Sequence, residues 1–174
     1  MSIIDDALRA NQDYAAQFNM GGLAMPPAKR LAVLACMDAR LDPAQLLGLK
    51  TGDAHVIRNA GGIATEDAIR SLIISHHLLG TQEFMVINHT DCGMLTFKDQ
   101  ELADRLKRET GASAAVPTSF HSFTNLEQNV RDQLKKLRAH PWLPHGVSVR
   151  GFIYDVKTGK LNEVAVEQTK GHAG

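Results

Sequence analysis

The 174-residue sequence has few cysteines and few aromatic residues, no excess of charge and no long apolar run. Its 19 basic residues balance its 19 acidic residues, so the formal net charge is zero. The absence of a basic stripe or polybasic block argues against a nucleic-acid partner and against an anionic membrane surface. The apolar stretches are too short to span a bilayer. We therefore expect no nucleic acid and no membrane as a partner.

The N-terminal stretch MSIIDDALRANQDYAAQF carries acidic residues near its start and no basic segment. This pattern is not typical of a secretory signal, so we expect a cytoplasmic protein. A reducing compartment disfavours a stable disulfide. The two cysteines, Cys36 and Cys92, are then expected to be buried, catalytic or metal-bound. A disulfide between them and chance burial remain the alternatives.

Short apolar runs alternate along the chain with stretches of helical periodicity. The runs that predict buried strands cover residues 30–36, 54–59 and 83–89. Helices are predicted over residues 42–49, 65–80, 96–111 and 124–141, with Asp42 and Thr65 as the N-caps of the first two. A strand, a tight turn and a final strand are predicted over 148–164. This alternation predicts an α/β fold with a mainly parallel central β-sheet flanked by helices.

The chain is expected to form one domain over residues 1–174, because no internal boundary or repeat interrupts it. Residues 1–24 are predicted to be an N-terminal helix and linker arm. Ser2 is placed to cap that helix, and a glycine- and proline-containing stretch follows it. Residues 168–174 are predicted to be a disordered tail.

Residues with metal-binding side chains follow two of the predicted strands. Cys36 ends the run 30–36, and His89 and Cys92 lie at or just after the end of the run 83–89. Parallel sheets bring the carboxyl ends of neighbouring strands to one edge, where their ligands bind. If these two strands are neighbours, the three side chains converge there.

Two thiolates and one imidazole suit zinc, and three protein ligands leave a fourth tetrahedral position open for catalysis. Asp38 and Arg40 follow Cys36 closely. Asp38 could accept a hydrogen bond from zinc-bound water or bind zinc directly, and Arg40 could hold this carboxylate ionised and oriented. Zinc with two thiolate ligands acidifies its water less than an all-histidine zinc, so such a site gains from a carboxylate that manages the proton.

The segments CMDAR and HTDC resemble the C-x-D-x-R and H-x-x-C motifs of the β-class carbonic anhydrases. HVIRNAGG and GFIYDVKTGKL resemble two further segments of that family, closest to a short branch that lies near the carbonyl sulfide hydrolases. Matched position by position, the resemblance implies zinc ligands at Cys36, His89 and Cys92, and a catalytic dyad of Asp38 and Arg40.

The resemblance also bears on the substrate pocket. Arg58 and Gly62 lie in the matching HVIRNAGG segment and are expected to shape the pocket. Plant-like members have glutamine and phenylalanine where this chain has Pro27 and His55, so the implied pocket is not the plant one. His55 is a candidate to line the pocket or to shuttle protons, because its strand is expected to end near the site; otherwise it is a packed strand residue.

The function that the resemblance implies is reversible, zinc-dependent hydration of carbon dioxide to bicarbonate by a zinc-bound hydroxide. The alternative is a carbonyl sulfide hydrolase, because the same nucleophile can attack a linear molecule of similar shape. A third possibility is a non-catalytic binding or sensor protein in which Asp38 closes the zinc; Arg40 argues against it by offering Asp38 another partner. The implied assembly is a homodimer or homotetramer.

Overall fold

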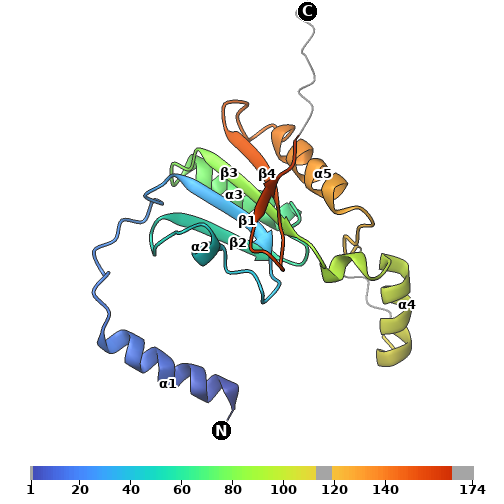
Figure 1. The fold of residues 1–174 in the computed structure, drawn as a ribbon, viewed down its shortest axis with the longest axis horizontal. Coiled ribbons are helices and arrows are strands. Elements are labelled where there is room, and N and C mark those ends of the chain that lie inside the picture. The colour runs from blue at the N-terminus through green and yellow to red at the C-terminus, as the bar shows by residue number, and fades with distance from the viewer. Residues whose placement is uncertain (1, 113–118, 166–174) are drawn as a thin grey trace, which may run out of the picture.

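Five strands form one sheet at the centre of the molecule (Figure 1). The structure is a computed structural model that describes residues 2–112 and 119–165. The strands are β1 (Leu31–Cys36), β2 (Ala54–Asn59), β3 (Glu83–His89), β4 (Ser148–Tyr154) and β5 (Leu161–Glu163). Their order across the sheet is β2-β1-β3-β4-β5. The first four run parallel to their neighbours, and only the pairing of β4 with β5 is antiparallel. The predicted α/β fold with a mainly parallel sheet is confirmed.

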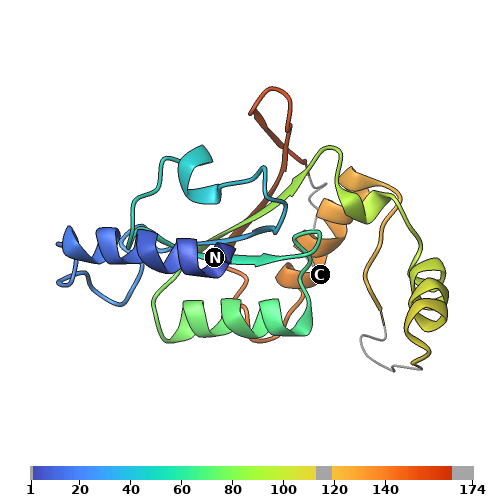
Figure 2. The same ribbon diagram turned by 90° about the horizontal axis from the view of Figure 1, so that it is seen from below.

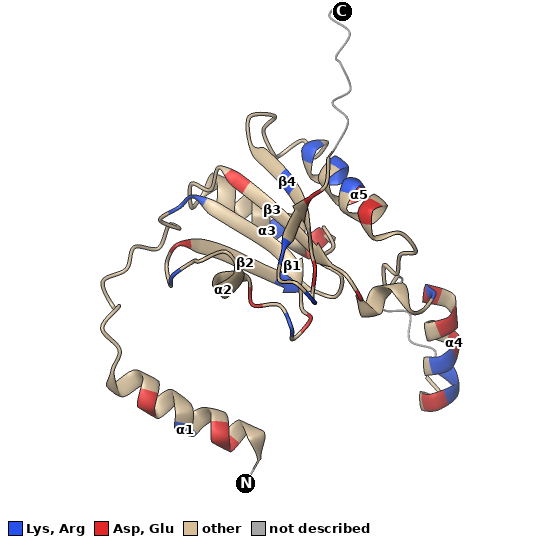
Figure 3. Ribbon diagram, viewed as in Figure 1, with Lys and Arg blue, Asp and Glu red and all other residues tan. Residues whose placement is uncertain are grey.

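The central position of β1 and β3 follows from their sequences. LAVLAC in β1 contains no charged residue, and Figure 3 shows this strand without charge along its length. From Ala32 to Cys36 every residue of β1 is buried, since both faces of the strand are covered. A strand covered on both faces needs apolar side chains at successive positions instead of alternating ones. In β2, at the edge of the sheet, no residue is fully buried, and half-buried and exposed positions alternate from His55 onwards.

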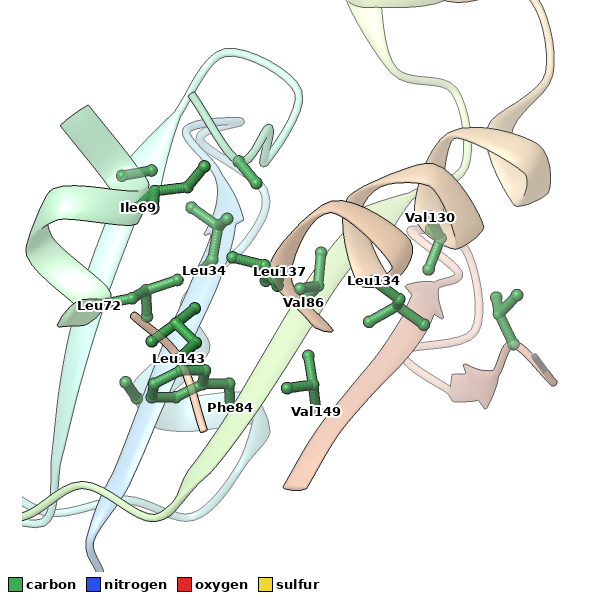
Figure 4. Close-up of a cluster of buried hydrophobic side chains, with 14 residues drawn as sticks. Leu34, Ile69, Leu72, Phe84, Val86, Val130, Leu134, Leu137, Leu143 and Val149 are labelled. Carbon is green, nitrogen blue, oxygen red and sulfur yellow. The ribbon is translucent and has the colours of Figure 1, made fainter. Parts of the chain in front are cut away.

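Helices α3 (Glu66–His77) and α5 (Leu126–Arg138) cover one face of the sheet. Figure 4 shows their side chains packed against Leu34 of β1 and Val86 of β3. Thr65 caps α3 as predicted, by accepting a hydrogen bond from the backbone N–H of Ala68. The apolar stripe of α5 contributes Val130, Leu134 and Leu137 to this core.

The opposite face is covered by the short helix α2 (Pro43–Leu46) and by loops, which lie across the sheet from α3 in Figure 2. The cluster of buried side chains on this face includes Cys36 and Cys92, together with Val33, Ile87 and Met94. The cysteines therefore lie in a part of the core that loops cover more than helices do, which leaves room for a pocket.

Two helices stand off the sheet in Figure 1: α1 (Ile3–Ala16) and α4 (Asp99–Thr110). Ser2 and Asp5 form a capping box at the start of α1, as the N-cap prediction requires. None of the described residues of α1 or α4 is buried. The helix predicted over 96–111 begins only at Asp99, because Gly93–Leu95 first form a 3-10 turn, η1.

The division into one domain with an arm over residues 1–24 stays a prediction, and the predicted tail 168–174 lies outside the described residues. Among the described helices, none has the length and apolar character needed to cross a membrane.

Gly151 of β4 lies directly beneath α5, and this contact gives a test of the packing. A β-carbon at this position would overlap Val130 Cγ1 and would approach Leu134 Cδ1 to 2.8 Å. We expect Gly151→Ala to lower the free energy of unfolding by about 1–3 kcal/mol, as overpacking does. Gly146→Ala is the matched control, because nothing lies within 4 Å of its β-carbon. Urea denaturation measures both; equal stabilities would contradict the packing described here.

Candidate metal centre

Strands β1 and β3 deliver three potential metal ligands to one edge of the sheet. β1 ends at Cys36, its neighbour β3 ends at His89, and the following turn brings Cys92 back. The two sulfur atoms and a ring nitrogen of His89 all lie within 4.8 Å of one another, and all three residues are buried. The convergence predicted from the strand order is thus present in the structure.

The orientation of the His89 ring leaves one nitrogen available to a metal. Its Nδ1–H donates a hydrogen bond of 2.8 Å to the carbonyl oxygen of Thr90, which leaves the lone pair of the neutral ring on Nε2. Nε2 is buried and has no hydrogen-bond partner among the described residues. A buried polar atom without a partner is costly, and a metal ion would satisfy it.

The two cysteines are free thiols, so the alternative of a Cys36–Cys92 disulfide is wrong for this structure. A hydrogen bond from Cys92 lowers the pKa of Cys36 below its usual range, and the same contact raises the pKa of Cys92. The contact between the two thiols thus favours the thiolate form of Cys36. Two soft sulfur donors and one imidazole fit zinc, with three protein ligands and room for a fourth.

Asp38 and Arg40 form a bidentate ion pair beside these ligands. Arg40 Nε and Nη2 donate to the two oxygens of Asp38 at 2.9 and 2.8 Å, and the backbone N–H of Arg40 donates to Oδ1 at 2.9 Å. These bonds from Arg40 hold the pKa of the Asp38 carboxyl well below its usual range. Because folding lowers this pKa, the pair contributes stability above about pH 4, and that contribution is lost as the pH falls. Asp38 Oδ2 lies 3.6 Å from Nε2 of His89.

Asp91 also contacts Arg40, a contact that the sequence did not suggest. Arg40 Nη1 donates to Asp91 Oδ2 at 2.7 Å, and Nη2 donates to the Asp91 carbonyl oxygen at 2.9 Å. The residue lies between His89 and Cys92 and has φ of 54°, in the left-handed region that Asp tolerates better than most residues. Its position within the turn was visible in the sequence, but its partner was not.

Arg58 and Gly62 act on the backbone behind the ligands. Arg58 donates to the carbonyl oxygens of Cys36 at 3.0 Å and of Asp38 at 2.7 Å, and so braces the segment that carries both. Gly62 has φ of 62°, and a β-carbon there would lie 3.0 Å from the backbone nitrogen of Cys36. Only glycine fits this close approach without a shift of the ligand strand. Neither Arg58 nor Gly62 is among the described residues that line the pocket around the ligands.

A chain of buried amides, which the sequence analysis missed, links α5 to the same region. Asn129 donates to Asn88 at 2.6 Å, Gln133 donates to Asn129 at 3.0 Å, and Asn88 donates to the carbonyl oxygen of Gly62 at 3.4 Å. Asn88 immediately precedes His89. Two amides four residues apart on the buried face of an otherwise apolar helix were the signal that could have revealed this network.

The structure does not bring His55 to the pocket of its own chain. Its partner in β1 is Ala32, at the amino end of the strand, whereas Cys36 lies at the carboxyl end opposite Asn59. The His55 ring is hydrogen-bonded to Ser75 at 2.7 Å. The expectation that strand β2 ends near the site with His55 is therefore not met, and the packed strand residue is the better description.

The ligands and Asp38 line a pocket of about 290 Å³. Most of its remaining wall is apolar or small, with Met37, Ala39, Ala60 and Met94 among the lining residues. Such a wall suits a small molecule with little polarity. The polar groups at its base are those of the ligand set and the Asp38 carboxylate.

Comparison with known proteins identifies the family. A sequence model of the carbonic anhydrase family matches residues 31–161. Beta-carbonic anhydrase 1 of Mycobacterium tuberculosis is 50% identical over 165 residues, which cover 94% of this chain and 99% of that protein. The crystal structure of carbonic anhydrase from Streptococcus mutans is similar with a TM-score of 0.89 and 44% identity, over 95% of this chain and 99% of that one. A carbon disulfide hydrolase from Acidianus sp. is 35% identical over an alignment of 191 positions, which covers 95% of this chain and 92% of the hydrolase. The chain therefore belongs to the β-carbonic anhydrase family, which confirms the resemblance of its two short motifs.

Proposed function

We propose that this protein is a zinc-dependent carbonic anhydrase that reversibly hydrates carbon dioxide to bicarbonate. One observation carries the proposal: a buried Cys36, His89 and Cys92 donor set lies beside an Asp38 carboxylate that Arg40 holds ionised. Membership of the β-carbonic anhydrase family supports the same reaction.

Cys36, His89 and Cys92 would hold the zinc ion. Bound zinc supplies the Lewis acidity that makes water a usable nucleophile near neutral pH. The partnerless Nε2 of His89 and the free thiols of the two cysteines support this ligand assignment. Ligands of this kind must lose their protons to bind, and the lowered pKa of Cys36 favours that loss at the first of them.

Asp38 and Arg40 would manage the orientation of the reacting water. The Asp38 carboxylate can accept a hydrogen bond from that water and so direct the oxygen lone pair towards the carbon of the substrate. Arg40 keeps Asp38 charged, because protonation would break a bidentate pair. With its pKa held well below the usual range, Asp38 stays a carboxylate at every pH at which the protein is expected to work.

The apolar wall of the pocket supports a small linear substrate without net charge. Carbon dioxide fits this description, and so do carbonyl sulfide and carbon disulfide. The 35% identity to a carbon disulfide hydrolase favours hydrolysis of such sulfur compounds as the second candidate function. The same nucleophile and the same carboxylate would serve either reaction, so the pocket wall decides between them.

The third possibility, a zinc closed by Asp38, receives less support. Both oxygens of Asp38 accept hydrogen bonds from Arg40, at 2.9 and 2.8 Å. To close the zinc, Asp38 would have to give up part of this bidentate pair. The pair therefore favours an open fourth position and an enzyme.

We further propose that the protein is a homodimer, or a homotetramer built from two such dimers, in which α1 packs on a partner subunit. The apolar stripe of α1 is uncovered, with Ile4 71% and Leu8 60% exposed. A helix of 14 residues is marginal in water without tertiary packing.

The free thiols of the proposed ligand set favour a reducing compartment, such as the cytoplasm.

The first test concerns the metal. We expect about one zinc per chain. The zinc should be lost when Cys36, His89 or Cys92 is replaced by Ala, because the two remaining ligands would bind it too weakly to retain it during purification. Elemental analysis of the purified variants measures this. His55→Ala is the control, since its ring contacts Ser75 instead of the ligands, and it should keep its zinc. Full zinc occupancy in Cys92→Ala would refute the ligand assignment.

The second test concerns the reaction. We expect the zinc-loaded protein to hydrate carbon dioxide faster than it hydrolyses carbonyl sulfide or carbon disulfide, measured side by side under one set of conditions. Asp38→Ala should keep its zinc and lose rate by roughly 10²–10⁴-fold, as the removal of an acid–base group does. Arg40→Ala should also keep its zinc and lose most turnover, because Asp38 is then free to bind the metal. Faster turnover of a sulfur substrate would select the second candidate, and no turnover of any of the three would reject both.

The third test concerns the arm. Deletion of residues 1–20 should convert the assembly to monomer or aggregate, measured by light scattering on a sizing column. The double variant Ile4→Ser, Leu8→Ser should weaken the assembly in the same way, because both residues belong to the uncovered stripe. Asp13→Ser, away from that stripe on the same helix, should leave it unchanged. An unchanged dimer or tetramer after the deletion would show that α1 does not form the interface.

A further inference from the structure

Arg40 is shared between two carboxylates, and its contacts with Asp91 are as short as those with Asp38. We propose that Asp91 is a positioning residue that fixes the Arg40 guanidinium through the N–H groups that Asp38 leaves unused, and so keeps Asp38 away from the metal. This inference rests on the proposed function and adds a third member to its catalytic pair.

The hydrogen bonds divide the guanidinium between two partners. Nε and one N–H of Nη2 point to the Asp38 carboxylate. Nη1 points to Asp91 Oδ2, and the second N–H of Nη2 points to the Asp91 carbonyl oxygen. A planar group held along both edges cannot rotate about its own long axis without breaking bonds on each side. Asp38 therefore faces a donor pair of fixed direction.

The same contacts tie together the two segments that carry the proposed ligands. Arg40 follows Cys36 after β1, whereas Asp91 lies between His89 and Cys92 after β3. The pair joins residues 51 apart in the sequence. Movement of Arg40 away from Asp38 would thus have to disturb the turn that carries two ligands as well.

The solvent exposure of Asp91 indicates that its loss should affect the orientation of Arg40 more than the folding stability. Its side chain is 75% exposed, and ion pairs this open to water contribute little to folding stability. Loss of the carboxylate should therefore leave the protein folded. Its effect should appear in the orientation of Arg40, which is only half-exposed, and through Arg40 in Asp38, which is largely covered.

Without the Asp91 side chain, the guanidinium loses the bond of Nη1 and keeps on this edge only the bond of Nη2 to the backbone carbonyl oxygen of residue 91. Asp38 then has a less rigid partner, and its carboxylate can turn towards the proposed zinc ligands. Its Oδ2 already lies 3.6 Å from Nε2 of His89. The expected result is a folded, zinc-containing protein with lower turnover. Substrate binding in the apolar pocket should be unchanged, because Asp91 is not among the described residues that line it.

The experiment compares Asp91→Asn and Asp91→Gly with the wild-type protein. Asparagine keeps an oxygen that can accept from Nη1 but removes the charge, whereas glycine removes the side chain and tolerates the φ of 54° without strain. Asp67→Asn is the matched control, since Asp67 also pairs with an arginine, is 76% exposed and lies on α3 away from the pocket. All four proteins are purified with zinc and measured at one pH.

We expect Asp91→Gly to lower kcat by about 10- to 100-fold with KM and zinc content unchanged, as a misplaced catalytic group does. Asp91→Asn should show a smaller loss, and Asp67→Asn none. Nitrogen-15 NMR of the arginine side chains supplies a readout that does not depend on turnover. The Arg40 Nε–H signal, assigned with Arg40→Lys, should exchange with solvent faster in Asp91→Gly, both with zinc and without it.

Two results would overturn the proposal. One is an unchanged kcat or an unchanged exchange rate of Arg40 Nε–H in Asp91→Gly. The other is a loss of zinc that parallels the loss of rate, since Asp91 would then support the ligand turn instead of Arg40. If the wild-type protein turns over none of the three substrates, the proposed function fails, while the exchange measurement still decides whether Asp91 positions Arg40.

Discussion

The parallel pairing of β1 with β3 is the constraint on which the rest of this structure depends. Because the two strands run side by side in the same direction, Cys36 and His89 reach the same edge of the sheet. The buried apolar residues of both strands hold that pairing, between α3 and α5 on one face and the loops on the other. Stability and the ligand set therefore have a common origin, since the side chains that stabilise the sheet also align its ends.

The loops beyond that edge supply what the strands cannot. A strand end can present one ligand, but a carboxylate that must stay charged needs a cation fixed beside it. Arg40 fulfils this role for Asp38, and Arg58 braces the backbone from Cys36 to Asp38 by bonding to the carbonyl oxygens of both residues. Gly62 allows the neighbouring loop to approach the ligand strand closely enough for this arrangement. The site is thus built from backbone support as much as from its reactive side chains.

The strand and helix pattern was predictable because it rests on local properties. Thr65, Asp42 and Ser2 cap helices at the positions where their side chains suggested it. The convergence of the ligands followed from the rule for parallel strands. The role of His55 stayed open because the sequence shows that it lies in a strand but not the register of that strand against β1. Asp91 and the amides Asn88, Asn129 and Gln133 were missed because each of them bonds to a residue distant in the sequence.

The sequence by itself determined the fold class, the identity of the candidate ligands and the family, because each of these depends on residue type, periodicity or spacing along the chain. Only the tertiary structure decided that Arg40 bridges two carboxylates, that His55 lies at the opposite end of the sheet from Cys36, and that α1 leaves its apolar stripe uncovered. The physical reason is that side-chain partners and solvent exposure depend on strand register and loop geometry, which arise from contacts between residues far apart in the chain.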